Sequence, residues 1–213
     1  MPTFVFADLA GFAALTEAHG DAAAAGLVRE FEALVRRTLP PQTRLVKMIG
    51  DAAMIVTDNA GDAIRLAQVL LDNVEALPGR PAVRIGVHTG DAVQRDGDFW
   101  GHAVNIAARV AGEARPCEIL VTGDALRGID AALRASITPE PLGDTHLRNV
   151  ASPVAIYRIS GGGDGLVTDP VCRMRLHAGE SAASLRHSGK TYSFCSLDCA
   201  HTFGEHPEVY AAR

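Results

Sequence analysis

The sequence has few aromatic residues and no excess of basic ones. Phe, Trp and Tyr make up 5% of the 213 residues, and the net charge is −5 at pH 7. Because a nucleic-acid-binding surface neutralises phosphates with Lys and Arg, we expect no nucleic-acid partner. No apolar run reaches the roughly 20 residues of a membrane-spanning helix, so we expect no membrane contact. Residues 1–12 have no basic start ahead of an apolar stretch, which predicts a soluble, cytoplasmic protein.

Cysteine is scarce as well. The chain has only four cysteines, and three of them follow residue 171. A secreted domain stapled by disulfides would be richer in cysteine, and in a reducing compartment such residues bind metal or stay free. Their clustering predicts a separate C-terminal domain. The composition, 47% apolar and 21% charged, is typical of a folded rather than a disordered chain.

A glycine-rich segment divides the chain. Four of the six residues in 160–165 are glycine, and glycine weakens helices and strands alike, so this segment is expected to act as a flexible tether. We therefore predict a first domain at 1–159, a linker at 160–168 and a second domain at 169–213.

The apolar residues of the first domain alternate between helical and strand periodicity. Helices are predicted from about residue 21, from a cap at Asn59 or Asp62, and over 104–110. Strands are predicted at 4–7, 44–48, 52–57, 83–88, 118–121 and 154–159. This mixture predicts a sandwich in which helices pack on one or both faces of a sheet.

Two aspartates lie at strand ends beside glycines. Asp8 ends the first predicted strand shortly before Gly11, and Asp51 follows Gly50 at the tip of a predicted hairpin. Either aspartate alone is explained equally well as a turn former or a helix cap. Magnesium needs only a few hard oxygen ligands in addition to substrate phosphates, so two carboxylates from adjacent strands suffice for a two-ion site. The pair suggests a metal–nucleotide site.

A second polar pair lies downstream. Asn105 and Arg109 are four residues apart on the predicted helix 104–110, so their side chains leave the same face one turn apart. An amide and a guanidinium placed in this way can hold one substrate together. The alternative is an ordinary solvated polar face.

Taken together, these residues resemble the class III adenylate and guanylate cyclases. The resemblance covers about residues 3–159, including the closing segment 147–157. It rests on six separated positions, namely Asp8, Lys47, Asp51, Asp98, Asn105 and Arg109. It implies an α+β fold, a ferredoxin-like or palm-type sandwich of a mainly antiparallel sheet with helices, and an enzyme that makes a cyclic nucleotide.

The resemblance also implies a substrate and metal ions. Asp8 and Asp51 would bind two Mg²⁺ or Mn²⁺ ions per active site, and Lys47 and Asp98 would recognise adenine. In this family, lysine with aspartate or threonine at the base-reading positions implies ATP, whereas guanylate cyclases usually have glutamate and cysteine. We therefore expect an adenylate cyclase that converts ATP to 3′,5′-cyclic AMP and pyrophosphate.

By the same resemblance, Asn105 would orient the ribose and Arg109 would stabilise phosphate charge in the transition state. In the family the active site forms between two domains arranged head to tail, with the metal carboxylates from one chain and the other residues from its partner. Since this chain has the whole set, we expect a homodimer with two equivalent sites. It departs from the family in two ways: His102 stands where many relatives have an acid, and segment 91–97 is shorter than the hairpin that embraces the partner in many members.

The second domain resembles the YHS domain, a small treble-clef-like metal-binding module. Its thiols at Cys172, Cys195 and Cys199 can close on one soft ion, Zn²⁺ or Cu⁺. A domain of this size commonly gains stability from a metal. The metal can serve structure or sensing, and reduced cysteines packed as small apolar side chains are the alternative. The fourth ligand is left open among His187, Asp198, His201 and His206.

Three functions are compatible with these two domains. The first is an adenylate cyclase whose dimer and rate respond to metal bound in the tail. The second is a catalytically silent nucleotide or metal sensor that keeps the cyclase fold as a dimer scaffold. The third is a metal chaperone acting through the tail, which would bind copper tightly and release no pyrophosphate.

Overall fold

The first strand, β1 (Thr3–Leu9), is the third strand of a seven-stranded sheet with the order β2-β3-β1-β5-β8-β10-β9. The computed structural model describes residues 1–77, 79–161 and 166–211. Among the described strands of this sheet, β5 and β8 are the one parallel pair, so the predicted mainly antiparallel α+β fold is confirmed. The remaining strands are β2 (Arg44–Ile49), β3 (Ala52–Thr57), β5 (Val83–Thr89), β8 (Glu118–Thr122), β9 (Glu140–Thr145) and β10 (Val154–Gly161).

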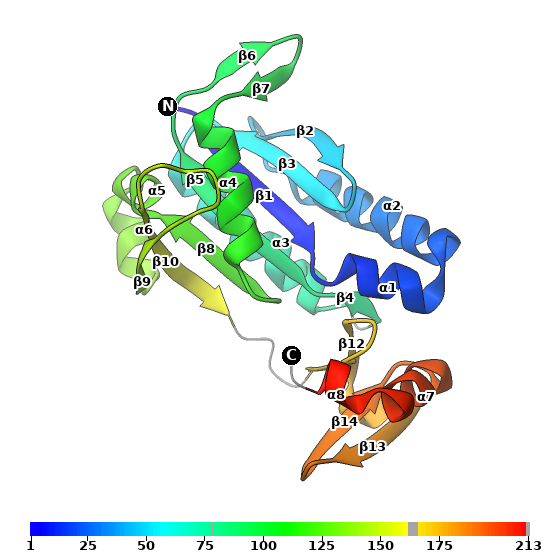
Figure 1. Ribbon diagram of the computed structural model, residues 1–213. Helices are drawn as coiled ribbons and strands as arrows, with labels where there is room; N and C mark the ends of the chain where they lie inside the picture. The colour runs from blue at the N-terminus through cyan, green and yellow to red at the C-terminus, as the bar shows by residue number, and fades with distance from the viewer. Residues whose placement is uncertain (78, 162–165, 212–213) are drawn as a thin grey trace.

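Side chains alternate between the two faces of the sheet, and each face is covered by helices. The odd-numbered apolar side chains of β1 pack with α2 (Asp21–Thr38) and α3 (Ala60–Glu75). The even-numbered Phe4 and Phe6 pack beneath α4 (His102–Glu113) on the other face. Figure 1 shows α4 in front of the sheet and α3 behind it. The core is therefore a three-layer sandwich with helices on both faces, the second of the two arrangements that the sequence left open.

Helix α4 lies directly against β5 at Gly86. A Cβ atom at this position would come within 2.2 Å of the backbone nitrogen of Ala111. Only a residue without a side chain allows the helix to approach the strand so closely. The contact fixes the position of α4, which carries Asn105 and Arg109, over the sheet.

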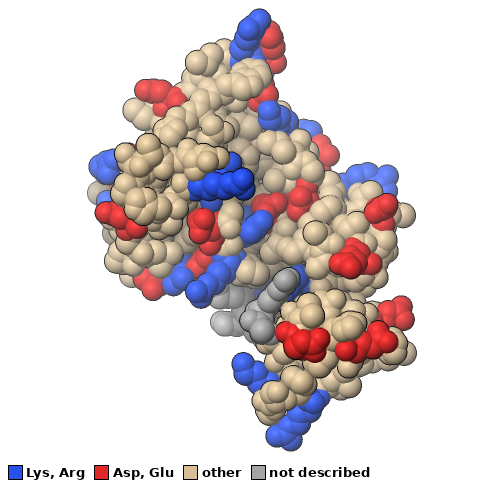
Figure 2. All heavy atoms as spheres, viewed as in Figure 1, with Lys and Arg blue, Asp and Glu red and all other residues tan. Residues whose placement is uncertain are grey.

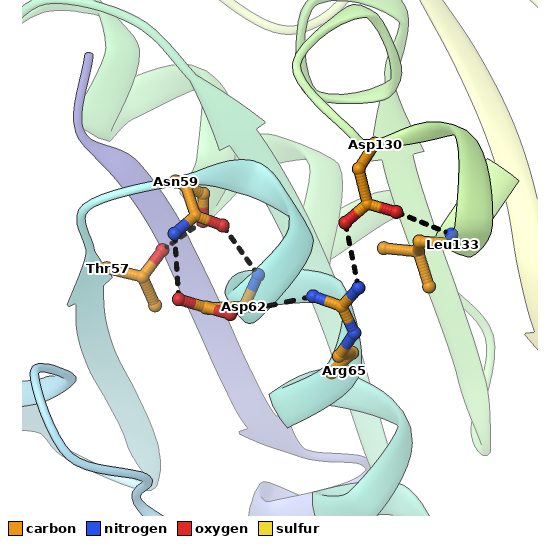
Figure 3. A network of polar contacts seen from close by, with 6 residues as sticks. All are labelled: Thr57, Asn59, Asp62, Arg65, Asp130 and Leu133. Atoms are coloured by element: carbon orange, nitrogen blue, oxygen red, sulfur yellow. Dashed lines mark hydrogen bonds and ion pairs between the residues drawn. The ribbon is translucent and has the colours of Figure 1, made fainter.

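The start of α3 is held by one side-chain cap and by an ion pair, both shown in Figure 3. Asn59 is the N-cap, and its Oδ1 accepts a hydrogen bond from the backbone nitrogen of Asp62 at 2.9 Å. Arg65, one turn further on, donates to Asp130 at 2.9 Å, just before α6 (Ala131–Ser136). Of the two caps that the sequence suggests, Asn59 is thus the one whose side chain caps the helix.

Several short elements lack the periodic apolar face that sequence analysis detects. Helix α1 has a single buried side chain, Leu15, and the β6–β7 hairpin projects from the edge of the sandwich in Figure 1. These elements are α1 (Phe12–His19), β6 (Val93–Arg95), β7 (Asp98–Trp100), α5 (Gly123–Arg127) and α6, together with β9.

The C-terminal tail forms a small lobe below β4 and α1 in Figure 1. Its first sheet has the order β11-β12-β4, so it includes a two-residue strand, β4 (Arg80–Pro81), from the first domain. The other elements are β11 (Leu166–Thr168), β12 (Met174–His177), the short 3-10 helix η1 (Ala178–Glu180), β13 (Ala183–His187), β14 (Lys190–Phe194), α7 (Leu197–Glu205) and α8 (Pro207–Tyr210).

At both of its described ends, the predicted linker 160–168 forms part of a β-strand. Strand β10 continues to Gly161 because the sheet partner β8 still pairs with it there, and β11 belongs to the tail sheet. Residues 162–165 lie outside the described residues. The domain limits 1–159 and 169–213 remain a prediction.

The visible surface has no single dominant charge. On the face shown in Figure 2, Lys and Arg side chains are interspersed with Asp and Glu. Within residues 1–77, 79–161 and 166–211, no helix combines the length and the apolar character needed to cross a bilayer.

Candidate active site and metal centre

Asp8 sits near the end of β1, where its carboxylate is held by an arginine from the neighbouring strand. The Arg84 guanidinium donates to Asp8 Oδ2 through Nε at 2.7 Å and approaches it through a terminal nitrogen at 2.5 Å. Asp8 and Arg84 are direct partners in the β1–β5 register, so both side chains lie on the same face of the sheet. The Asp8 side chain keeps 18% of its surface exposed, which leaves it accessible to a ligand.

Asp51 lies beside Asp8 at the same edge. It precedes Ala52, which is the β3 partner of Asp8, and Gly50 forms the turn with a positive φ of 63°. Burial, and secondarily the charge of Asp8, raise the pKa of Asp51 to about 6. Two carboxylates this close together attract a cation between them. The oxygen donors here fit a hard divalent ion such as Mg²⁺ or Mn²⁺.

Lys47 and Asp98, the two positions expected to read the base, are in direct contact. The Lys47 ammonium lies 2.5 Å from Asp98 Oδ2, and Asp98 Oδ1 accepts from the backbone nitrogen of Phe99 at 2.8 Å. The hydrogen bond from Lys47 holds the pKa of Asp98 below its usual value. Lys47 also lies 5.9 Å from the centre of the Trp100 ring. Strand β2 and the β6–β7 hairpin therefore together present a donor–acceptor pair that is still partly exposed.

Asn105 and Arg109 lie on the outer face of α4. Both are exposed, whereas Ile106, Ala107 and Val110 on the same helix are buried against the sheet. Among the described residues, neither polar side chain has a hydrogen-bonding partner. The expected common face is therefore present, and both groups are available for a ligand or a partner chain.

Sheet parity places the groups expected to bind metal and to read the base on one side of the sheet. Asp8 has the parity of Phe4 and Phe6, and Lys47 pairs with Met54, which packs in the same cluster beneath α4. The side of the sheet that carries α4 thus holds these predicted groups together with Asn105 and Arg109. Arg84 belongs to the same face and was not anticipated, because an arginine alternating with apolar residues in a strand looks like an ordinary solvated position.

The three tail cysteines converge. Cys195 Sγ lies 3.4 Å from the sulfur of Cys172 and 3.8 Å from that of Cys199. Contacts with Cys172 and then Cys195 lower the pKa of the Cys199 thiol, whereas the contact with Cys195 raises the pKa of Cys172. One of the three sulfurs is thus favoured as a thiolate, the form that binds metal. Thiolates grouped in this way fit a soft ion.

A buried carboxylate organises the two loops that carry these thiols. Asp169 is fully buried, and its Oδ1 accepts from the backbone nitrogens of Val171 at 2.8 Å and Cys172 at 3.3 Å. Its Oδ2 accepts from the backbone nitrogen of Cys195 at 2.8 Å. Asp169 therefore ties the first cysteine loop to the second. Its position directly before Pro170 suggests only a turn, so sequence reasoning gave it no role.

The four candidate fourth ligands do not lie in the thiol cluster. His201 and His206 are well exposed beside Glu205 and Glu208, and the His187 ring packs on Phe203. Asp198 is also exposed. The fourth member of the cluster found within the described residues is His19, the last residue of α1.

Two families match the chain. Residues 2–161 match the family described as the adenylate and guanylate cyclase catalytic domain, and residues 167–213 match the YHS domain. A pH-sensitive adenylate cyclase of Mycobacterium tuberculosis is 32% identical over 161 residues, which are 75% of this chain and 41% of that protein. An adenylate cyclase of Streptomyces griseus is 34% identical over 57% of this chain and 31% of its own length. The chain therefore spans well under half the length of these relatives.

Solved structures have the same fold. An adenylate cyclase from Trypanosoma brucei, described in its monomeric state, superimposes with a TM-score of 0.67 at 25% identity, covering 74% of this chain and 88% of that one. The adenylyl cyclase CyaB from P. aeruginosa gives a TM-score of 0.63 over 76% of this chain and 94% of that one, at 19% identity, which supports the fold alone.

Proposed function

Because this chain belongs to the family of adenylate and guanylate cyclase catalytic domains and carries a YHS domain behind that part, we propose that it is an adenylate cyclase. The reaction would convert ATP to 3′,5′-cyclic AMP and pyrophosphate. The observation that supports adenine over guanine is the contact between Lys47 and Asp98. Lys47 can donate to adenine N1 while Asp98 accepts from the N6 amine, and guanine presents the reverse pattern.

In the reaction, the ribose 3′-oxygen attacks the α-phosphorus, the bond to the β-phosphate oxygen breaks, and the hydroxyl proton passes to solvent. Two Mg²⁺ or Mn²⁺ ions would lower the pKa of this hydroxyl and neutralise the leaving pyrophosphate. Asp8 and Asp51 would hold these ions. Asn105 would orient the ribose, and the planar guanidinium of Arg109 would donate to phosphate oxygens as their charge develops.

We place the active site between two copies arranged head to tail. Asp8 and Asp51 would come from one chain, and the base-reading pair with Asn105 and Arg109 from the other. Asn105 and Arg109 on α4 have no hydrogen-bonding partner among the described residues, so both are available to a substrate in such a site. A patch beside them also supports association, since Val93 and Trp100 face each other across the β6–β7 hairpin and are 68% and 50% exposed.

Cyclic AMP formation from ATP with Mg²⁺ or Mn²⁺ tests the reaction, with the wild type beside Asp51→Ala over a range of protein concentrations. We expect activity that rises steeply with concentration in the wild type and is lost in the variant. A folded protein that makes no product at any concentration would contradict the proposal and favour a silent sensor.

Mixing two inactive variants tests the arrangement of the dimer. Asp51→Ala and Arg109→Ala damage opposite halves of the proposed site, so an equal mixture should form heterodimers with one intact site. Half of the dimers in such a mixture are mixed, which predicts roughly a quarter of the wild-type activity. A mixture that stays inactive, while each variant still dimerises, would exclude the shared site.

We further propose that Cys172, Cys195 and Cys199 bind a soft ion, Zn²⁺ or Cu⁺, that adjusts the dimer and its rate. The convergence of the three thiols supports binding. Unchanged turnover and dimerisation on adding and chelating these metals would rule out the regulatory part. The cytoplasmic location stays a prediction that cell fractionation can test.

A further inference from the structure

The thiol cluster of the tail includes a side chain from the cyclase domain. His19 Nε2 lies 3.6 Å from Cys195 Sγ, and the ligand atoms of His19 and the three tail cysteines all lie within 4.8 Å of one another. His19 and Cys195 are separated by 176 positions in the sequence. We propose that a single Zn²⁺ ion is bound by the three tail thiolates and by His19, and that it joins the two domains.

The three distances from the Cys195 sulfur are close to those of a tetrahedral zinc site. With Zn–S bonds of about 2.3 Å and a Zn–N bond of about 2.0–2.1 Å, ligand atoms at tetrahedral angles lie about 3.8 Å apart for two sulfurs and about 3.6 Å apart for sulfur and nitrogen. Cys195 lies 3.8 Å from the Cys199 sulfur and 3.6 Å from the His19 nitrogen. The Cys172 contact of 3.4 Å needs only a small adjustment. Three cysteines and one histidine are a common ligand set of structural zinc, which explains the preference for Zn²⁺ over Cu⁺.

The packing around His19 shows that its position is built into the domain contact. Ala18, the preceding residue of α1, packs against the apolar cluster of the tail. The side chain of Arg173 covers Gly11 so closely that a Cβ there would lie 2.3 Å from its Cγ. These contacts hold both ends of α1 against the tail.

A second group of contacts holds the tail against β4 and the end of α3. The backbone nitrogen of Gly79 donates to the carbonyl of Arg175 at 2.7 Å, beside the β4–β12 pairing. The buried guanidinium of Arg175 lies 3.8 Å from the Glu75 carboxylate at the end of α3. Backbone pairing, a buried charge pair and α1 packing together give His19 a defined place relative to the thiols.

Zinc at this position would act on the catalytic segment. Helix α1 begins at Phe12, directly after Gly11 and four residues after Asp8. An ion that holds the C-terminal end of α1 restrains the turn that follows the metal-binding carboxylate. Loss of zinc therefore loosens the segment from Leu9 to His19 rather than only the tail.

The test compares His19→Ala with His201→Ala in the full chain. His201 is a matched control because it lies in the tail but is 77% exposed and outside the cluster. After removal of metal with a chelator, each protein is titrated with Co²⁺ as a spectroscopic probe and with Zn²⁺ in competition with a chromophoric chelator. We expect the wild type and His201→Ala to give the same four-coordinate Co²⁺ spectrum. His19→Ala should give an altered spectrum and bind Zn²⁺ at least about 10-fold more weakly.

Hydrogen exchange gives the readout for the domain link. Zinc should slow exchange of the α1 amides in the wild type and in His201→Ala, but not in His19→Ala. An unchanged spectrum and affinity in His19→Ala would overturn the inference. If that variant fails to fold, X-ray absorption of the zinc-loaded wild type decides, since three sulfurs with one imidazole support the site and three sulfurs with oxygen overturn it.

This inference rests on the soft-metal binding proposed above but on no nucleotide chemistry. A wild type that binds neither Zn²⁺ nor Cu⁺ at the tail thiols would overturn this inference together with the soft-metal proposal, and would leave the cyclase reaction untouched. Equal zinc affinity in the wild type and in His19→Ala would overturn the domain link alone.

Discussion

The two domains hold their functional groups in different ways. The main apolar cluster of the cyclase domain contains 26 buried residues among those described, drawn from the sheet and the helices on one face. The corresponding cluster of the tail contains six, and two of these are cysteines that also belong to the thiol group. A site on a large sheet keeps its shape without a ligand, whereas the tail depends on hydrogen bonds, docking and metal for its order.

The largest expected effect is a loss of catalytic rate in the cyclase domain without a loss of its stability. Arg109→Lys keeps the charge but removes the planar fork, and loss of one such donor in a transition state costs ~100-fold or more in kcat. Because Arg109 is exposed and lies on the sheet-supported helix, the unfolding midpoint and the zinc affinity of the tail should not change. Steady-state cyclic AMP assays beside a zinc titration check this, and a parallel loss of zinc affinity would contradict the separation of the two sites.

The next effect tests how the tail is held. In Asp169→Asn, one side-chain atom becomes a donor facing the donor N–H of Cys195, so the link between the two cysteine loops is lost. We expect zinc affinity to fall ~10–100-fold and the tail to lose about 2 kcal/mol of stability. Asp198→Asn is the control, since Asp198 is exposed. Equal zinc affinity in both variants would show that Asp169 does not organise the site.

A smaller effect concerns the choice of nucleotide. Lys47→Glu combined with Asp98→Ser exchanges donor and acceptor at the proposed base-reading pair, while the sheet and the proposed metal-binding carboxylates stay intact. The ratio of kcat/KM for ATP to that for GTP should fall at least about 10-fold. Competition assays with both nucleotides measure it. If the ratio is unchanged while total activity falls, the pair does not read the base.

The smallest expected effect is on the stability of the sheet core. His88 on β5 is 5% exposed and contacts Thr122 Oγ1 at 2.8 Å, and burial lowers its pKa. Because the unfolded chain then binds the proton more readily, the free energy of unfolding should decrease as pH falls below the ordinary histidine pKa of about 6.5. Urea unfolding at several pH values should show a shallower decrease in His88→Gln than in the wild type. Identical slopes would remove His88 as a cause.

The sequence was sufficient to predict the strands and helices in which apolar residues recur with strong periodicity. Strand ends and helix faces in the cyclase domain follow apolar repeats, so the positions of Asp51 at a turn and of Asn105 and Arg109 on one helix face agree with expectation. The short helix α1 was not predicted, because a helix with one buried side chain has little periodic signal.

The proposed fourth zinc ligand, His19, could not be predicted from the sequence for a different reason. His19 looks like an ordinary helix C-terminal residue, and the tail offers several histidines closer in sequence to the thiols. What brings His19 to the cluster is the docking of α1 on the tail, a long-range contact that spacing does not encode. Arg84 is similar, since only strand register reveals that it faces Asp8.

The distance in sequence between the zinc ligands has a consequence for folding. Cys172 and Cys195 are 23 positions apart, whereas His19 and Cys195 are 176 apart. Three doublings in loop length add about 2 kcal/mol of closure entropy in an unfolded chain, and a folded cyclase domain removes this cost by bringing α1 to the tail beforehand. We therefore expect a chain with a misfolded cyclase domain to release its ion more readily than a correctly folded one.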